Sequence, residues 1–129
     1  IADMGGVRTP SNHEVTFARQ AVALAGRLAT IPVLDQVVAD FRDDTRFAAE
    51  SAEARAIGFA GKLCIHPAQV PLANAAWTPT QAEVERARRL LAAYDEALGR
   101  GVAAIDFEGQ MVDEPLAAQA RRVLTLAGD

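Results

Sequence analysis

The most constraining feature of the sequence is a pair of short apolar segments, each preceded by a helical pattern. Residues 31–38 and 62–66 are short and mostly aliphatic, as is typical of strands covered on both faces. Pro32 stands at the start of the first segment, where a missing N–H is least costly. Strands that alternate with helices form parallel sheets. The first part therefore predicts an α/β fold, and because two strands alone need neighbours, we expect a slice of a larger sheet or barrel.

A long helix is expected before the first strand. Ser11 and Glu14 have the spacing of a capping box, in which each side chain bonds the other residue's backbone N–H. Two apolar stripes follow at helical spacing: Phe17, Ala21, Leu24 and Leu28, and Val15, Ala18, Val22 and Ala25. Together the stripes predict a well-buried helix of about five turns.

A second helix is expected between the two strands. Asp43 or Asp44 is placed to cap its first turn, and Gly58 to end it in a left-handed conformation. One face is expected to be buried, and it carries Phe47, Ser51 and Ala54.

The pattern changes after residue 66, and we place a boundary near Trp77. A helix is expected from an N-cap in residues 78–80 to Gly99, then a short hairpin turning at residues 108–109, then a helix capped by Asp113. The sequence thus predicts two regions, residues 1–76 with the α/β pattern and residues 77–129 with a helix–hairpin–helix pattern.

Composition excludes several classes of protein. The 129 residues are half hydrophobic and 23% charged, as in a globular chain of one domain's size. A net charge of −4 argues against a nucleic-acid binder. The apolar runs are too short for a membrane span, and a single cysteine gives no sign of an oxidising compartment. We expect a cytoplasmic protein, and the absence of an initiator Met suggests part of a longer chain.

The end of the second strand is the first candidate site, because ligands of parallel α/β proteins bind at the carboxyl ends of strands. Cys64, Ile65 and His66 lie there. Three interpretations remain open: the loop lines a pocket through its backbone, His66 acts directly in catalysis, or His66 and Cys64 are structural. Asp35, inside an apolar strand, must be paired or face a polar cavity. Pairing with Lys62 and substrate contact are both open.

Two acidic positions have simpler explanations. The carboxylates of residues 40–44 are explained by helix capping better than by cation binding. Asp113 directly precedes Glu-Pro at a helix start, so an N-cap accounts for it without any function. The histidines and the cysteine lack the spacing of a metal site.

Several ordered motifs resemble one family. They are GFAGKLCIHPAQV at residues 58–70, TP at 78–79 and GQMVDEP at 109–115, with shorter matches at residues 8–10, 17–19, 31–35 and 40–43. These stretches are similar to the HpcH/HpaI aldolase and citrate lyase β-subunit-like CoA-thioester lyases, which include malyl-CoA and citramalyl-CoA lyases. The resemblance covers essentially the whole chain and matches the C-terminal part of a family member.

The resemblance implies a (β/α)8 TIM barrel followed by a C-terminal lid. Residues 31–38 would be its seventh strand and residues 62–66 its eighth. The family binds Mg²⁺ through a Glu and an Asp on earlier strands, which would precede Ile1. We therefore expect Mg²⁺ as cofactor, with no metal ligand in this chain.

The resemblance also assigns roles to residues in the chain. Leu63 and Cys64, leading into Ile65 and His66, match the substrate-contacting position. Asp113 matches the family's acidic residue that reaches into a neighbouring subunit and acts as acid and base, which implies a homo-oligomer, a trimer or hexamer.

Two functions of different class follow. The first is a Mg²⁺-dependent carbon–carbon lyase acting on 3-hydroxyacyl-CoA thioesters such as malyl-CoA, citramalyl-CoA or citryl-CoA. The second is a catalytically inactive or regulatory domain that binds a partner. The missing metal carboxylates favour the second for this chain by itself, whereas Asp113 favours the first for the intact protein. An unrelated α/β fragment with chance motifs is a third interpretation.

Overall fold

The computed structural model describes residues 2–128, which divide into two compact units, one ending at Trp77 and one beginning at Thr78. Each of the two units has its own apolar cluster. Ala23, Ala54 and Phe59 are buried together in the first, and Leu90, Tyr94 and Val112 belong to the cluster of the second.

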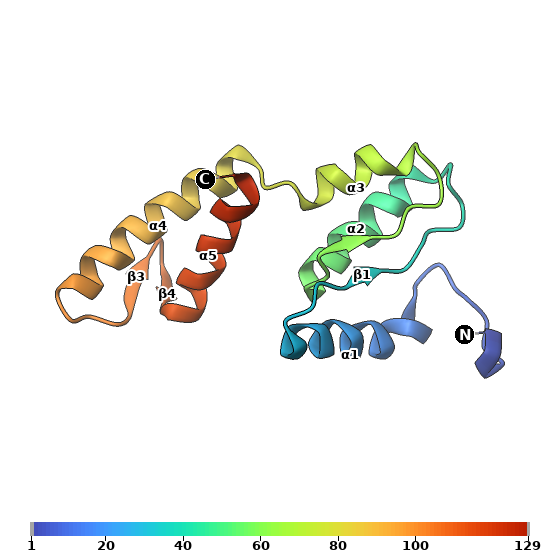
Figure 1. Cartoon of the computed structure of the whole chain (residues 1–129), viewed down its shortest axis with the longest axis horizontal. Coiled ribbons are helices and arrows are strands. Elements are labelled where there is room, and N and C mark those ends of the chain that lie inside the picture. Colours follow the sequence, from blue (N-terminus) through green and yellow to red (C-terminus); the bar gives the residue numbers. More distant parts are fainter. Residues whose placement is uncertain (1, 129) are drawn as a thin grey trace. The chain divides into compact units, whose positions relative to one another are not determined.

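The first unit combines helices with a small parallel sheet (Figure 1). Its elements are a 3-10 helix η1 (Ala2–Met4), α1 (His13–Ala29), β1 (Leu34–Asp35), α2 (Asp44–Ile57), β2 (Gly61–Lys62) and α3 (Gln69–Trp77). The strands pair in parallel, with Leu34 opposite Gly61 and Asp35 opposite Lys62. This pairing confirms the α/β class expected from the alternation of helices and short apolar segments.

Both strands are shorter than predicted, and β1 is not covered on both faces. Leu34 is 55% exposed, whereas Asp35 is only 1% exposed. The described residues give each strand one neighbour, so one backbone edge of each lacks a ladder partner. The ladder is continued on either side by the bonds from Ala60 N to Val33 O and from Leu63 N to Asp35 O, at 2.8 and 3.0 Å.

Helix α1 buries a different face from the predicted one. Its buried residues are Val15, Arg19, Ala23 and Gly26. Phe17, Leu24 and Leu28 lie on the opposite side of the helix, at 83%, 62% and 79% exposure. The packed face carries small residues because α1 approaches β1 closely: a Cβ on Gly26 would lie 2.6 Å from Val33 Cγ1.

The capping box predicted for α1 does not form. Asn12 occupies the N-cap position in the left-handed region, and its side chain makes no capping bond. Its amide oxygen instead accepts from Arg8 Nη2 at 2.6 Å. Glu14 accepts from the backbone N and Oγ1 of Thr9, at 2.9 and 2.7 Å, and these bonds lower the Glu14 pKa to about 2.

Helix α2 matches its prediction. The Asp43 carboxylate accepts from Arg46 N at 2.9 Å, and Gly58 ends the helix with φ of 111°, a conformation that glycine adopts without strain. The predicted face is buried: Phe47, Ser51 and Ala54 are all 1% exposed or less.

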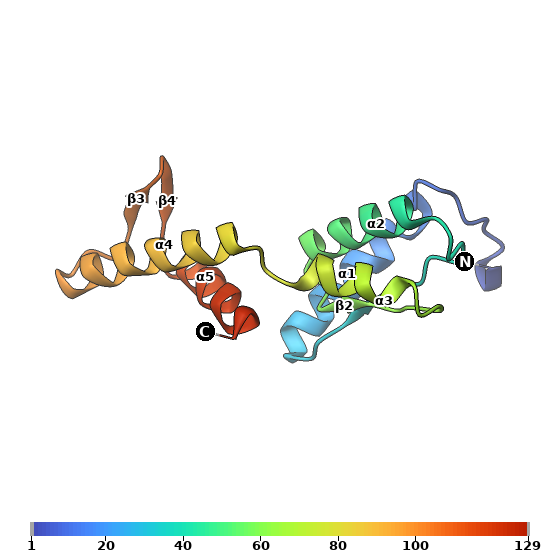
Figure 2. The ribbon, with the colours of Figure 1, turned by 90° about the horizontal axis from the view of Figure 1, so that it is seen from above.

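The second unit consists of α4 (Gln81–Gly99), β3 (Ile105–Phe107), β4 (Gln110–Val112) and α5 (Glu114–Ala127). Thr80 caps α4 in a complete capping box with Glu83. The strands form the predicted antiparallel hairpin, which stands to one side of the helix pair in Figure 2. Glu108 and Gly109 at its turn both have positive φ, as a two-residue hairpin loop requires.

Candidate functional site

The buried carboxylate of Asp35 is held by two cations. Arg19 donates to it through Nε and Nη2 at 2.9 and 3.0 Å, and Lys62 Nζ donates at 2.8 Å. The structure therefore shows the pairing with Lys62 that was one of the two interpretations of Asp35. Arg19 belongs to α1 and Lys62 is the β2 residue opposite Asp35, so the three side chains meet on one face of the sheet. Both oxygens of Asp35 are engaged.

Further carboxylates balance the two buried cations. Lys62 Nζ also lies 3.4 Å from Glu50 Oε2, and Arg46 donates to the other Glu50 oxygen at 2.7 Å. Arg19 Nη1 donates to Glu53, which is half exposed, at 2.7 Å. We call the set Arg19, Asp35, Glu50 and Lys62 the buried charge cluster. It links α1, β1, α2 and β2 by one side chain each.

The cluster determines the protonation of its carboxyls. Burial by itself raises the pKa of Asp35, but the hydrogen bonds from Arg19 and Lys62 outweigh burial and hold that pKa below its usual value. Burial likewise raises the pKa of Glu50, and hydrogen bonds and the charges of Lys62 and Arg46 reverse the direction. Both carboxyls are therefore ionised near neutral pH.

Sequence reasoning missed Arg19 and Glu50 as members of this cluster. A carboxylate inside an apolar strand signals a buried cation nearby, and Lys62 was the candidate found. Arg19 was overlooked because it interrupts an apolar helix face, and Glu50 because it flanks the face of Phe47 and Ser51 on α2.

The predicted contact residues Leu63, Cys64, Ile65 and His66 follow β2 directly, at the carboxyl end of the sheet. Leu63 N is bonded to Asp35 O, so these residues lie beside Asp35. Ile65 N donates to Gln69 Oε1 at 2.8 Å. Leu63 and Ile65 are about half exposed, and Cys64 is a half-buried free thiol. The loop thus combines a fixed backbone with open side chains.

His66 is exposed but held in one orientation. Its ring stacks on Phe41 with centroids 4.4 Å apart, and its Nδ1 accepts from Ala68 N at 3.1 Å. The Ala68 bond places the proton of the neutral ring on Nε2. A ligand at this edge would therefore meet an N–H donor. The guanidinium of Arg42 lies over the Phe41 ring, 4.7 Å from its centroid.

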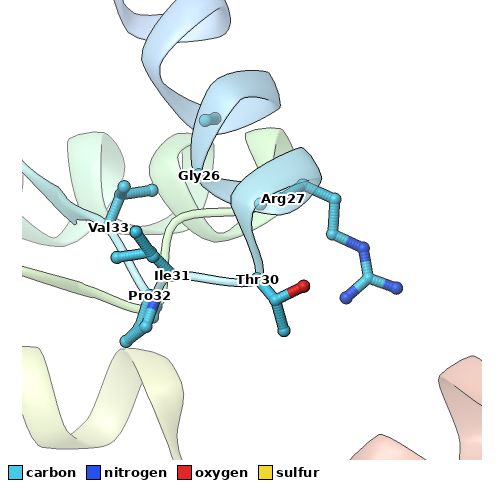
Figure 3. A pocket seen from close by; sticks show the side chains of 9 residues that line it. Gly26, Arg27, Thr30, Ile31, Pro32 and Val33 are labelled. Atoms are coloured by element: carbon cyan, nitrogen blue, oxygen red, sulfur yellow. The ribbon is translucent and has the colours of Figure 1, made fainter.

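A cavity of about 230 Å³ lies at the opposite end of the strands. Pro32, Val33 and Ala60, which precede β1 and β2, line it together with the end of α1. Figure 3 shows this turn, with Arg27 directed away from Ile31 and Val33. Because ligands of parallel sheets bind at carboxyl ends, this cavity is not the candidate site.

Asp113 lies in the second unit, where it links β4 to α5. It holds the N-cap position in an extended conformation, yet its side chain makes no capping hydrogen bond. Val112 before it is completely buried, and Ala117 N donates to the backbone oxygen of Asp113 at 2.9 Å. The backbone of Asp113 is thus fixed while its half-buried carboxylate is not engaged in capping α5.

A buried tyrosine lies near this carboxylate. Tyr94 is 2% exposed in the core between α4 and α5. Burial raises the pKa of the Tyr94 hydroxyl, and the negative charges of Glu114 and Asp113 raise it further. Glu114 also accepts from Arg121 Nη1 at 2.5 Å.

Metal ligands do not gather in the part of the chain that the structure describes. Within residues 2–128, no group of three or more His, Cys, Asp or Glu side chains is placed to hold a metal ion. The residues present therefore do not fit Mg²⁺ by themselves. None of the described helices has the length and apolar character needed to span a membrane.

Known proteins resemble the chain over nearly its whole length. A citrate lyase subunit beta-like protein of Deinococcus radiodurans is 52% identical over 123 residues, covering 95% of this chain and 43% of the relative. The mitochondrial citramalyl-CoA lyase of Mus musculus is 36% identical over 126 residues, covering 98% and 37%. The chain thus spans about two fifths of the length of these relatives.

A solved structure has the same α/β fold. The crystal structure of CitE from Mycobacterium tuberculosis, in complex with magnesium, acetoacetate and coenzyme A, matches with a TM-score of 0.86 and 34% identity. The match covers all of this chain and 49% of CitE. The profile of one protein family, HpcH/HpaI aldolase/citrate lyase, matches residues 1–67, more than half of the sequence. The chain belongs to the HpcH/HpaI aldolase/citrate lyase family.

Proposed function

We propose that the intact protein is a carbon–carbon lyase that cleaves or forms 3-hydroxyacyl-CoA thioesters such as malyl-CoA, citramalyl-CoA or citryl-CoA. Relatives named citrate lyase subunit beta and citramalyl-CoA lyase support this assignment, as does the complex of CitE with magnesium and coenzyme A. In this proposal residues 1–76 supply the last two strands of a TIM barrel, and residues 77–129 supply a lid.

Exposed apolar surfaces support the barrel. Phe17, Leu24 and Leu28 form an apolar face on the outer side of α1, and Leu34 is exposed on the face of the sheet opposite Asp35. A barrel covers both kinds of surface, because its helices pack against neighbouring helices and its interior is filled with side chains.

The uncommitted carboxylate of Asp113 is the observation that carries the proposal. The helix-capping explanation predicts a hydrogen bond from the first turn of α5, and none is present. A carboxylate that is half buried, on a fixed backbone and free of a capping role is available as a general acid and base.

The proposed role of Asp113 is to transfer a proton to and from C2 of the acyl-CoA. As the C2–C3 bond breaks, the C3 hydroxyl gives its proton to a base of the intact site outside this chain and becomes a carbonyl. The electron pair of the broken bond stays on C2 as the enolate of the acyl-CoA. Protonated Asp113 then delivers its proton to C2, and in the synthetic direction its carboxylate removes that proton. We propose that Asp113 does this in the active site of a neighbouring subunit, within a trimer or hexamer.

The remaining parts of the site come from both within and outside this chain. The backbone of Leu63 and Cys64, with Ile65 and His66, is proposed to contact the acyl-CoA at the barrel edge. Asp35 is proposed to support that edge through its backbone bond to Leu63. Mg²⁺, which when bound would stabilise negative charge on the substrate oxygens, would be held by residues other than those described here.

The test is Asp113→Asn in the intact protein, with citramalyl-CoA and malyl-CoA as probes and acetyl-CoA release in the presence of Mg²⁺ as the readout. We expect turnover to fall at least about 100-fold, as for loss of a general acid, with an unchanged unfolding transition. Asp106→Asn is the matched control, since Asp106 lies in the hairpin that precedes Asp113 and accepts from Gly109 N, a bond that the Asn oxygen can keep.

Two results would contradict the proposal. Near-normal turnover in Asp113→Asn would remove the assignment of Asp113. No turnover by the wild type with either probe or with citryl-CoA would favour the second function, a catalytically inactive interaction domain.

A further inference from the structure

Gln69, the first residue of α3, is one of the most deeply buried polar side chains in the first unit, at 1% exposure. Both ends of its amide are used. Oε1 accepts from Ile65 N at 2.8 Å, and Nε2 donates to Val38 O at 3.0 Å. Val38 is also 1% exposed. The side chain therefore joins two backbone segments, one after each strand.

The two segments are register partners that have separated. Asp35 pairs with Lys62, and both Val38 and Ile65 lie three residues further along. A continued ladder would therefore bring these two residues opposite each other. A glutamine amide offers the same C=O and N–H as a peptide unit. Gln69 therefore bridges the gap between the diverging strands with the groups that a backbone would have used.

The bridge fixes the loop that we assign to substrate contact. Leu63 N is bonded to Asp35 O on one side, and Ile65 N is bonded to Gln69 on the other. Cys64 lies between these two bonded amides. Without Gln69, Ile65 would lose its partner and only the bond at Leu63 would hold the loop to β1.

We infer that Gln69 is a positioning residue for acyl-CoA binding, acting through the backbone of residues 63–65. This inference rests on the proposed lyase function. Docking of α3 alone does not require the bridge, because the other end of the helix has its own bond: Trp77 Nε1 donates to Phe59 O at 2.8 Å. The Trp77 bond is a side-chain-to-backbone bond in the same unit, remote from the carboxyl ends of the strands.

The Trp77 bond provides the matched control. In the intact protein we compare Gln69→Met, Gln69→Glu and Trp77→Phe, using whichever of malyl-, citramalyl- and citryl-CoA the wild type cleaves fastest. Gln69→Met keeps the volume and removes both bonds. We expect its KM to rise about tenfold, the effect of about one hydrogen bond, with kcat within about twofold. Trp77→Phe should leave KM within about twofold.

Gln69→Glu gives a readout that a purely structural role would not move. When neutral, its carboxyl can accept from Ile65 N and donate to Val38 O as the amide does. When ionised, it can only accept, and it repels Val38 O. Burial favours the neutral form, so the KM ratio to wild type should fall toward one as pH is lowered from 8 to 5. Dividing by the wild-type KM at each pH removes the pH dependence that the two proteins share.

The outcomes are distinguishable. An active wild type with a pH-independent KM ratio near one for Gln69→Glu would overturn the role of Gln69 and leave the lyase function standing. Equal KM increases in Trp77→Phe and Gln69→Met would also overturn it. A wild type inactive toward all three thioesters would overturn the proposed function, and this inference with it. If Gln69→Met does not fold, the change in the KM ratio of Gln69→Glu between pH 8 and pH 5 decides.

Discussion

Replacing Asp35 by Asn tests the buried charge cluster most directly. Asp35 is 1% exposed and accepts three charge-assisted hydrogen bonds from Arg19 and Lys62. Asn keeps one acceptor oxygen and turns a donor toward cations. With the Asn oxygen in the position of Oδ2, which accepts from Arg19 Nη2 and Lys62 Nζ, the bond from Arg19 Nε is lost, at about 1.5–3 kcal/mol. Removal of one partner from a buried pair costs about 3–5 kcal/mol, and we expect a loss in this range.

The assay is urea unfolding followed by the fluorescence of Trp77, the only tryptophan in the sequence and part of the first unit. Glu53→Gln is the control, because it also removes a carboxylate that pairs with Arg19, but one whose side chain is 48% exposed. We expect Glu53→Gln to cost less than about 1 kcal/mol. A loss below about 1 kcal/mol in Asp35→Asn would refute the reasoning.

The same variant should change the response to acid. The pKa of Asp35 is depressed in the folded state, so its stabilisation is present above its unfolded pKa of about 3.9 and is lost as pH falls through the folded pKa. Asp35→Asn removes this contribution. Its free energy of unfolding should therefore decline less steeply than that of the wild type below about pH 4. Identical declines in the two proteins would show that Arg19 and Lys62 do not lower the pKa of Asp35.

Two further substitutions test local packing and capping by urea unfolding. Gly26→Ala should destabilise the first unit by about 1–3 kcal/mol, because the new Cβ would lie 2.6 Å from Val33 Cγ1. Gly99→Ala is the control and should not lower the free energy of unfolding, because a Cβ on Gly99 would meet no atom within 4 Å. Equal effects of the two substitutions would contradict the close approach of α1 to Val33. Thr80→Ala should cost the second unit about 1 kcal/mol, while Thr78→Ala should stay within about 0.5 kcal/mol; the reverse order would place the cap at Thr78.

Elements whose signals are local were predictable from the sequence. The cap at Asp43, the stop at Gly58 and the hairpin turn at Glu108–Gly109 each depend on a few neighbouring residues, and the structure shows all three. The parallel pairing of β1 and β2 was also predictable, because a helix between two short apolar segments leaves few alternatives.

Helix α1 was not predictable in the same way, because its packing depends on partners distant in sequence. Hydrophobicity favoured the stripe of Phe17, Leu24 and Leu28. The packed face instead contains Arg19, whose burial is stabilised by Asp35 sixteen residues later, and Gly26, whose lack of a side chain permits contact with Val33. Hydrophobic periodicity depends on apolar residues, so it does not predict the burial of a paired charge or of a glycine that close packing requires.

The candidate site likewise contains residues with a local sequence signal and residues whose role depends on distant partners. Asp35 could be identified from sequence because an isolated carboxylate in an apolar strand demands an explanation. Gln69 could not, because a polar residue at a helix start looks like ordinary surface, and only the separation of Val38 from Ile65 gives its amide a role.

Asp113 shows how structure can reverse the weight of two interpretations. By pattern alone it is an N-cap, which would contribute about 1 kcal/mol to the start of α5. In the structure the carboxylate forgoes that bond, and the helix start has Pro115 in its first turn instead. The missing capping bond supports the proposed role of Asp113. Asp113→Asn should therefore separate activity from stability.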